Sequence, residues 1–342
     1  MNKKHLLLTI IKLLGAFWVA RRLTAHSLRI LCYHGISVED EHEFRGRLFM
    51  QEQTFLKRMH LLQQLGHPVL PLDRALQQLR DGTLPPAAVV ITFDDGWEPA
   101  CMCALHWLVD QGIPATLYVS SYYVDKDTQV FNVAVQYLFW KSTVAQFDPP
   151  KLGDLSPYDL ADPVQRRQAL EAVLSEGKKL TTAGERQSLL EEVADALGVD
   201  IRAQGRKGAF RFASRDTILE LSRLGIDIQL HTHRHNLFDG SDKSIMQEIE
   251  DNRRALEYLG NSPRRHFCYP GGLYSPKMWP TLDRLDIESA TTCETGFNYQ
   301  DTPHLGLKRI LDEECLTMLE FEAELSGVFE LRRLAWEWFG FH

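Results

Sequence analysis

Three short segments of this chain contain the residue types that hydrolytic metal sites use. They are Thr92-Phe93-Asp94-Asp95-Gly96, His231-Thr232-His233-Arg234-His235 and Phe267-Cys268-Tyr269-Pro270-Gly271-Gly272. Together they supply two adjacent carboxylates, a pair of imidazoles four residues apart and a glycine-rich loop. A divalent metal ion held by such side chains can activate water for attack on a carbonyl group. The sequence therefore predicts a metal-dependent hydrolase.

The carboxylates and imidazoles have spacings that suit this chemistry. Asp94 and Asp95 repel each other at a predicted strand end, so they need a cation or a raised pKa to coexist. A metal ion bound to one carboxylate leaves the other free as a proton acceptor. His231 and His235 are spaced so that both imidazoles can reach one divalent ion such as Zn²⁺. Thr232 lies between them and is expected to bond the loop backbone and orient the histidines.

Each segment taken alone also has a simpler interpretation. Asp94-Asp95-Gly96 fits a turn that leaves a strand, and Pro270-Gly271-Gly272 fits a plain strand-to-helix turn. All three segments follow short apolar runs that predict buried strands. Because the carboxyl ends of parallel strands meet at one edge of a sheet, we expect the three segments to form one site. The backbone N–H groups of the glycine loop can then serve as an oxyanion hole.

Apolar runs alternate with amphipathic segments, a pattern that predicts parallel strands joined by helices. The predicted strands are 28–34, 68–72, 88–93, 115–121, 226–232, 266–270, 288–293 and 307–311. The predicted helices are 51–65, 99–111, 216–224, 242–259 and 276–285, with a closing helix at 316–341. We expect four aromatic residues of that tail to pack on the barrel or to help the N-terminus bind membrane: Trp336, Trp338, Phe339 and Phe341. Between 125 and 212 the strand signal is lost, and amphipathic stretches at 165–178 and 182–197 predict a helical insertion. This insertion is either a substrate lid or partner surface, or extra helices without functional contact.

The N-terminal segment combines basic residues with a long apolar stretch. Lys3 and Lys4 precede Leu6–Ala20, and Arg21-Arg22 follow it. Lys12 interrupts the stretch, which leaves apolar runs well short of the roughly 18 residues of a spanning helix. The preferred interpretation is an apolar or amphipathic helix within residues 1–27, with peripheral membrane contact through residues 1–22. An uncleaved anchor or a helix packed on the domain remain alternatives.

The composition excludes some functions and indicates a compartment. The formal net charge of −8 and the scattered Lys and Arg residues argue against a nucleic-acid partner. Six cysteines lie mostly in predicted strands or helices, so a disulfide framework is not expected and a reducing compartment is favoured. With the N-terminal helix, this indicates a cytoplasmic protein at the inner face of a membrane.

The three segments resemble the first three motifs of the polysaccharide deacetylases, a carbohydrate esterase family with a NodB-type homology domain. The motif residues are Thr92-Phe93-Asp94-Asp95-Gly96, His231-Thr232-x-x-His235 and Tyr269-Pro270-Gly271-Gly272. The resemblance runs from about residue 28 to 311 outside the insertion, and Leu31-Cys32-Tyr33-His34-Gly35 is similar to the first strand of many members.

The resemblance implies a distorted (β/α)7-type barrel over residues 28–342 with the helical insertion at 125–212. It also implies that Asp95, His231 and His235 hold a divalent metal ion, usually Zn²⁺. Asp94 would then be the general base for the attacking water. The segment from Tyr269 to Gly272 would form the oxyanion and substrate loop, with the N–H of Gly271 facing the oxyanion.

Two departures from the family pattern concern the partners of Asp94. The third motif often has an arginine just before its proline, where this chain has Cys268-Tyr269. Arg309, on the last predicted strand, is a candidate to reach the site instead. The segment that supplies the general acid in many members is not recognisable, which leaves His304 and His34 as candidates for this role or for the surroundings of the metal.

The leading hypothesis is a deacetylase that acts on an N-acetylated sugar of a polysaccharide, exopolysaccharide or glycolipid. Its partner would be an acetylated glycan or lipid-linked sugar, with release of acetate and a free amine, or a hydroxyl for an O-acetyl substrate. Two alternatives use the same residues. One is a catalytically silent carbohydrate-binding protein that keeps the metal site, and the other is an amidase or deformylase acting on a small substrate.

Overall fold

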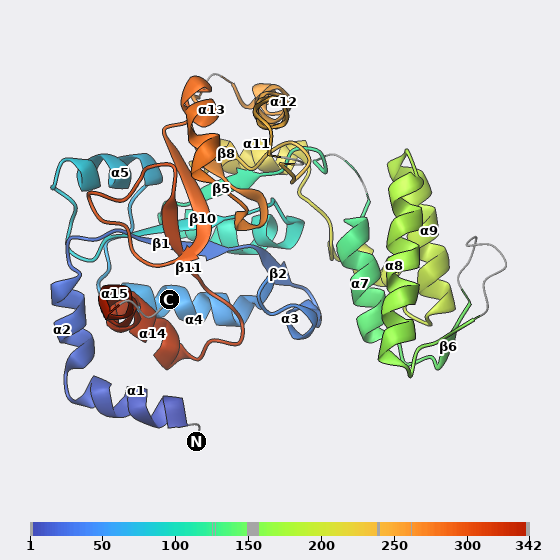
Figure 1. Cartoon of the computed structure of the whole chain (residues 1–342), viewed down its shortest axis with the longest axis horizontal. Coiled ribbons are helices and arrows are strands. Elements are labelled where there is room, and N and C mark those ends of the chain that lie inside the picture. The colour runs from blue at the N-terminus through green and yellow to red at the C-terminus, as the bar shows by residue number, and fades with distance from the viewer. Residues whose placement is uncertain are drawn as a thin grey trace.

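A closed barrel of parallel strands forms the centre of the computed structural model (Figure 1). The structure describes residues 3–124, 126, 128–148, 157–237, 240–260 and 262–339. Its strands are β1 (Arg29–Tyr33), β4 (Val89–Phe93), β5 (Thr116–Val119), β8 (Asp227–Leu230), β9 (His266–Cys268), β10 (Ser289–Thr295) and β11 (Leu307–Leu311). Around the barrel they follow the order β1-β11-β10-β9-β8-β5-β4. This seven-stranded arrangement confirms the predicted distorted (β/α)7-type barrel.

The strands form where the sequence has continuous apolar runs, because both faces of a parallel barrel strand are covered. Every residue of β1 and β4 is buried. The helices that cover the barrel are α4 (Glu52–Gln64), α5 (Leu72–Arg80), α6 (His106–Asp110), α11 (Arg215–Arg223), α12 (Asp242–Ala255) and α13 (Trp279–Arg284). A π-helical stretch, Ala100–Leu105, precedes α6. Asp94, His231 and Tyr269 each follow the last residue of a strand, so the three sequence motifs lie at the same rim.

The predicted strand at 68–72 is wrong. Val69 makes only an isolated parallel bridge to Val89, and α5 begins at Leu72 directly after Pro71. Prolines at 68 and 71 remove two backbone N–H donors that a strand in the barrel would need. After β1 the chain instead forms β2 (Gly35–Ser37), α3 (Glu41–Phe44) and β3 (Phe49–Gln51), with β2 and β3 paired in parallel.

The segment between β5 and α11 is mainly helical, and its helices stand to one side of the barrel (Figure 1). It contains α7 (Phe131–Lys141), α8 (Pro163–Lys179), α9 (Ala183–Ala196) and α10 (Ile201–Arg206). A small antiparallel pair, β6 (Gln146–Phe147) and β7 (Tyr158–Asp159), also lies here, although no strand is predicted in this segment. Residues 125, 127 and 149–156 of the predicted insertion lie outside the described residues.

Helices at the two ends of the chain pack against each other. The N-terminal segment forms α1 (Lys3–Leu13) and α2 (Ala16–Leu23), separated at Gly15, whose φ is 82°. The tail forms α14 (Met318–Ser326) and α15 (Val328–Phe339), separated at Gly327. Trp336 is exposed rather than packed on the barrel, whereas the other predicted tail aromatics lie outside the described side chains. Among the described helices, none has the length and apolar character needed to cross a membrane.

Candidate metal centre and active site

Asp95, His231 and His235 converge at the carboxyl ends of β4 and β8. The Oδ1 atom of Asp95 lies 3.2 Å from Nε2 of His231 and 3.1 Å from Nε2 of His235. The three ligand atoms lie within 4.8 Å of one another. Asp95 and His231 are buried, whereas the side chain of His235 is 40% exposed. These residues could serve as three metal ligands, and the exposed side of His235 would leave room for water or substrate.

The surroundings of these residues fit a bound cation. Asp95 Oδ1 is buried and has no hydrogen-bond partner among the described residues, a costly state for an ionised oxygen. Burial alone would raise the pKa of Asp95, but His235 and His231 hold it well below the usual range. A carboxylate oxygen that stays ionised and faces two imidazole nitrogens is a donor set that Zn²⁺ prefers.

Hydrogen bonds behind these side chains fix their orientation. Nδ1 of His231 lies 2.8 Å from the carbonyl oxygen of Cys268, so a proton on Nδ1 leaves the lone pair of Nε2 directed at the site. Asp95 Oδ2 accepts a 2.7 Å hydrogen bond from Nε1 of Trp97. Thr232 Oγ1 accepts a hydrogen bond from the backbone N–H of Asn236, as expected for a residue that orders the loop.

Asn252, on α12, connects the histidine loop to the neighbouring strand. Its Oδ1 accepts a 3.0 Å hydrogen bond from the backbone N–H of His231. Its Nδ2 donates to the carbonyl of Val119, the last residue of β5, and to Ser121. His233 turns away from the three ligands and lies 2.9 Å from the Ser121 hydroxyl. These contacts hold His231 in place without using the atoms that face the site.

Backbone strain is concentrated at the same place. Asp95, Thr232 and His235 have φ values of 76°, 60° and 54°, in the left-handed region that non-glycine residues rarely adopt. Only three other non-glycine residues of the described chain share this feature. Strained residues of this kind persist where the surrounding structure enforces a functional geometry.

Asp94 is paired with a buried guanidinium. Arg309, on β11, donates from NH1 to Oδ1 and from NH2 to Oδ2 of Asp94, each over 2.8 Å. The Nε of Arg309 donates to the carbonyl of Thr292 on β10, which fixes the plane of the guanidinium. Burial would raise the pKa of Asp94, but Arg309 and then His34 hold it well below the usual range. Asp94 therefore stays ionised, and Arg309 pairs with it where the third motif lacks its arginine.

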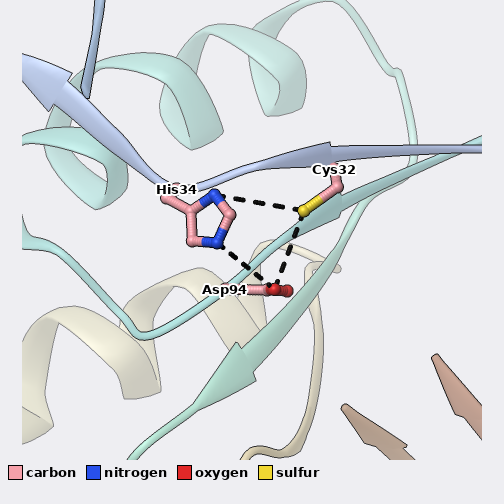
Figure 2. A group of neighbouring side chains, drawn as sticks. All are labelled: Cys32, His34 and Asp94. Atoms are coloured by element: carbon pink, nitrogen blue, oxygen red, sulfur yellow. Dashed lines mark hydrogen bonds and ion pairs between the residues drawn. The ribbon is translucent and has the colours of Figure 1, made fainter. Parts of the chain in front are cut away.

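His34 and Cys32 lie beside Asp94 (Figure 2). Nε2 of His34 is 3.6 Å from Asp94 Oδ2, and Nδ1 is 4.0 Å from the sulfur of Cys32. Burial lowers the pKa of His34, although Asp94 and Asp95 oppose this effect. The imidazole remains 22% exposed. The structure thus brings His34, which follows β1, to the edge of the site.

The position of His304 does not fit the predicted general acid. Its backbone carbonyl accepts a hydrogen bond from Ala290, near the start of β10, and its Nε2 lies 3.6 Å from Asp283 on α13. The loop that contains it leads into the amino end of β11, whereas Asp94 follows the carboxyl end of β4. A residue before a barrel strand lies at the opposite rim from the motifs, which is the physical reason for this correction.

The glycine loop borders a cavity beside the three ligands. The cavity has a volume of about 540 Å³. It is lined by His235, Asn236, Leu237, Gly240, Pro270, Gly271, Leu273, Tyr274 and Met278. Tyr269 points elsewhere, since its hydroxyl donates to the carbonyl of Leu305. Pro270 and Gly271 thus face the cavity, whereas Tyr269 supports the loop from behind.

Several residues at the site have no recognisable signal in the sequence. Cys268 places its sulfur 3.3 Å from Asp94 Oδ2 and 3.3 Å from NH2 of Arg309. Asn252 lies 21 residues after His231 on a helix, so spacing gives no indication that the two are bonded. Trp97 is different, because it lies only two residues after Asp95, and its indole N–H bonds the Asp95 carboxylate. Its place directly after the strand end was a usable signal.

Comparisons with known proteins agree with this geometry. A model of the polysaccharide deacetylase family matches residues 188–290, a range that contains His231, His235 and the glycine loop. No curated protein matches the chain. The deacetylase PplD of Streptococcus pyogenes, solved with acetate, is 16% identical, with a TM-score of 0.58 over 88% of this chain and 99% of that one.

Two further solved structures share the architecture. IcaB from Ammonifex degensii is 16% identical, with a TM-score of 0.57 over 88% of this chain and 96% of that chain. BA0330, a putative polysaccharide deacetylase from Bacillus anthracis, is 17% identical, with a TM-score of 0.55 over 87% of this chain and 69% of that chain. At these identities the likeness establishes a common fold.

Proposed function

We propose that this chain removes acetyl groups from an N-acetylated sugar of a polysaccharide or glycolipid with the help of a divalent metal ion, because a model of the polysaccharide deacetylase family matches residues 188–290. The observation that carries this proposal is that two adjacent carboxylates have different partners. Asp95 faces two imidazoles with an unpartnered oxygen, whereas Asp94 is paired with Arg309 beside them. Sugar binding alone needs no ionised base next to a metal site.

The proposed metal ligands are Asp95, His231 and His235. When bound there, a divalent cation, with Zn²⁺ as the expected ion, polarises an acetyl carbonyl and lowers the pKa of water to about 7. Asp94 is positioned beside this place to accept the proton of the attacking water. Arg309 holds both oxygens of Asp94, so the carboxylate cannot rotate away from the site.

We propose His34 as the group that delivers a proton to the leaving amine. An amide nitrogen must be protonated before it can leave, and an imidazole is the side chain best suited to this at neutral pH. Nε2 of His34 lies 3.6 Å from Asp94 Oδ2, and the imidazole remains partly exposed, so it can exchange protons with water. A proton taken up by Asp94 has only a short path to Nε2 of His34.

The cavity supports a sugar substrate. Its volume of about 540 Å³ is within the range of small-ligand sites, roughly 300–1,000 Å³. Tyr274 and Leu273 give it an apolar wall, and the backbone of Gly271 approaches it without a side chain. Such a wall suits the apolar face of a pyranose ring, while the exposed His235 lies at the border between cavity and ligands.

The test is acetate release from N-acetylated oligosaccharides, lipid-linked sugars and O-acetylated controls. We expect activity that is lost after chelation and restored by Zn²⁺ or another divalent ion. Asp94→Asn is expected to lower kcat by at least 100-fold, in line with the loss of a general base. Because this change leaves Arg309 buried without its partner, His235→Gln serves as a second variant, in which metal content is expected to fall.

The alternatives give different results in the same assay. Glycan binding without acetate release by any substrate would indicate the silent binding protein. Release of acetate or formate from small amides but not from sugars would indicate an amidase or deformylase. Full activity of Asp94→Asn on a substrate that the wild type cleaves would remove Asp94 from the mechanism.

A further inference from the structure

The outward side of α1 is apolar. Leu13 and Leu14 are 82% and 79% exposed, and they share one stripe of the helical segment with three other exposed residues, Leu6, Leu7 and Ile10. A helix on the surface of a soluble domain normally has the reverse arrangement, with its apolar stripe toward the core. This side of α1 is therefore adapted to an apolar environment outside the described chain.

Helix α2 also exposes apolar side chains. Trp18, Val19 and Leu23 are exposed, and the guanidinium of Arg22 lies over the indole of Trp18 at 4.5 Å from the ring centre. We call the exposed apolar residues of the two helices the N-terminal apolar face. It comprises Leu6, Leu7, Ile10, Leu13, Leu14, Trp18, Val19 and Leu23.

The opposite sides of these helices are fixed to the body of the protein. Leu8 and Phe17 are buried in a small cluster with Ala323 of α14. Lys4 and Lys12 form ion pairs with Glu320 and Glu322 of α14, each over 2.5 Å. The two helices are therefore attached to α14 by a small apolar cluster and two ion pairs. The N-terminal apolar face lies on their exposed side.

The charge of the segment identifies the kind of surface that would complement it. Residues 3–23 contain five basic residues and no acidic one, in a chain whose formal net charge is −8. The first acidic residue of the chain is Glu39. Lys3, near the start of α1, and Arg22, near the end of α2, are exposed at the two ends of the face. Apolar side chains flanked by basic ones are typical of helices that lie in the interface of an anionic bilayer.

We propose that the N-terminal apolar face binds the surface of an anionic lipid bilayer, with α1 and α2 lying in its interfacial layer. A second copy of the chain is a weaker candidate, because a two-fold interface would bring Lys3 and Arg22 of both copies onto the same surface. In Figure 1, α1 lies at the edge of the molecule below α14, away from the insertion helices. Membrane binding therefore leaves the insertion side of the barrel free.

The test is co-sedimentation of the full chain with vesicles. Phosphatidylcholine vesicles with and without phosphatidylglycerol distinguish an anionic from a neutral surface, and we expect tighter binding to the anionic vesicles that weakens with salt. The variant Leu7→Gln/Leu13→Gln/Leu14→Gln is expected to bind at least tenfold more weakly. Val164→Gln/Leu224→Gln is the matched control, because it replaces exposed apolar residues elsewhere, and it should bind as the wild type does.

A second variant tests the charges. Lys3→Gln/Arg22→Gln is expected to lose the preference for anionic vesicles while its deacetylase activity on a soluble substrate stays unchanged. Three results would overturn the proposal: no wild-type binding, equal binding to both vesicle types, or equal weakening in the control. A dimer in solution that the leucine substitutions dissociate would instead assign the face to a second copy.

Discussion

Asp94 combines two properties that oppose each other in a general base. The bidentate contact with Arg309 keeps its pKa well below the usual range, so the carboxylate is ionised at every physiological pH. A strongly ionised carboxylate is also a weak proton acceptor, since base strength follows pKa. In the proposed site, a bound cation would lower the pKa of the attacking water, so that a weak base such as Asp94 would be sufficient. Arg309 thus contributes orientation and permanent charge.

Some residues of the candidate site could be predicted from the sequence, and others could not. Asp94, Asp95, His231 and His235 follow strand ends in recognisable motifs, and the absence of a third-motif arginine directed attention to Arg309. His304 was a poor candidate because sequence order does not show at which rim a loop lies. The thiol of Cys268 fills the space beside Asp94 and Arg309, and no spacing rule identifies a contact of that kind.

His34 provides the sharpest test at the scale of a residue. We expect His34→Gln to lower kcat on an N-acetylated sugar by 10²–10⁴-fold, the usual contribution of a general acid or base. The change should leave KM nearly unchanged, because His34 is not among the residues that line the cavity. The measurement is steady-state kinetics together with metal content, which should equal that of the wild type.

A substrate that needs no acid separates catalysis from structural damage. 4-Nitrophenyl acetate has a leaving group that departs as the phenolate, so His34→Gln should hydrolyse it at close to the wild-type rate. Equal losses on the ester and on the sugar amide would mean that His34 supports the site structurally. Unchanged activity on both would exclude it from proton transfer.

At the scale of elements, the hydrophobic pattern predicted where strands and helices lie better than it predicted where a helix is interrupted. All seven barrel strands coincide with predicted apolar runs, because strands buried on both faces need continuous apolar sequence. The predicted N-terminal helix and closing helix are each divided by a glycine, Gly15 and Gly327, with φ values of 82° and 87°. A glycine inside an amphipathic pattern leaves the periodicity almost intact, so the pattern does not reveal the break.

The glycine loop after β9 allows a prediction with its own internal control. Gly271 and Gly272 have φ values of 60° and 68°, so alanine at either position meets a cost of roughly 1–2 kcal/mol. An added Cβ at Gly272 would lie 2.5 Å from Cβ of Cys293, whereas nothing lies within 4 Å of one at Gly271. We expect Gly272→Ala to lower the free energy of unfolding by about 1–3 kcal/mol more than Gly271→Ala, as overpacking typically does.

Urea unfolding of both variants measures this difference. Cys293 also lies near Arg309, with its sulfur 3.9 Å from NH2, so displacement of Cys293 should reduce kcat in Gly272→Ala. Gly271→Ala instead adds a methyl group to the lining of the cavity and should act mainly on KM. Equal stability of the two variants would show that the loop yields without cost.

At the scale of the whole molecule, the functional surfaces lie on different parts of one folded body. The core that fills the barrel continues into the insertion, where Phe131, Phe147 and Leu190 belong to the same buried cluster as β4. Asp40 reinforces this connection through Tyr137 and Lys141 of α7. The rim with the three motifs and the insertion therefore share one core, and a loss of global stability would affect both.

The pH dependence of that global stability is set in part by His67, in the turn between α4 and α5. Burial lowers its pKa from 6.5 to about 4, and Arg21 and Arg29 act in the same direction. The neutral ring lies with Nδ1 2.8 Å from the carbonyl of Ala87. Because the folded-state pKa lies below the unfolded value, the unfolded chain binds more protons as the pH falls. Stability from this group is complete above about pH 6.5 and is lost toward pH 4, by about 3 kcal/mol.

Asp312 works in the opposite direction over part of the same range. Burial raises its pKa from 3.8 to about 6 despite the neighbouring Arg58, so its contribution is complete below pH 3.8 and is lost as the pH rises through 6. The wild-type dependence of stability on pH therefore sums two opposed effects.

The variant His67→Gln isolates the effect of His67, because the amide can donate to the Ala87 carbonyl but does not titrate. We expect the difference in unfolding free energy between variant and wild type to shift by about 3 kcal/mol in favour of the variant from pH 7 to pH 4. Urea unfolding at both pH values measures it, and a difference that does not change with pH would mean that folding does not lower the pKa of His67.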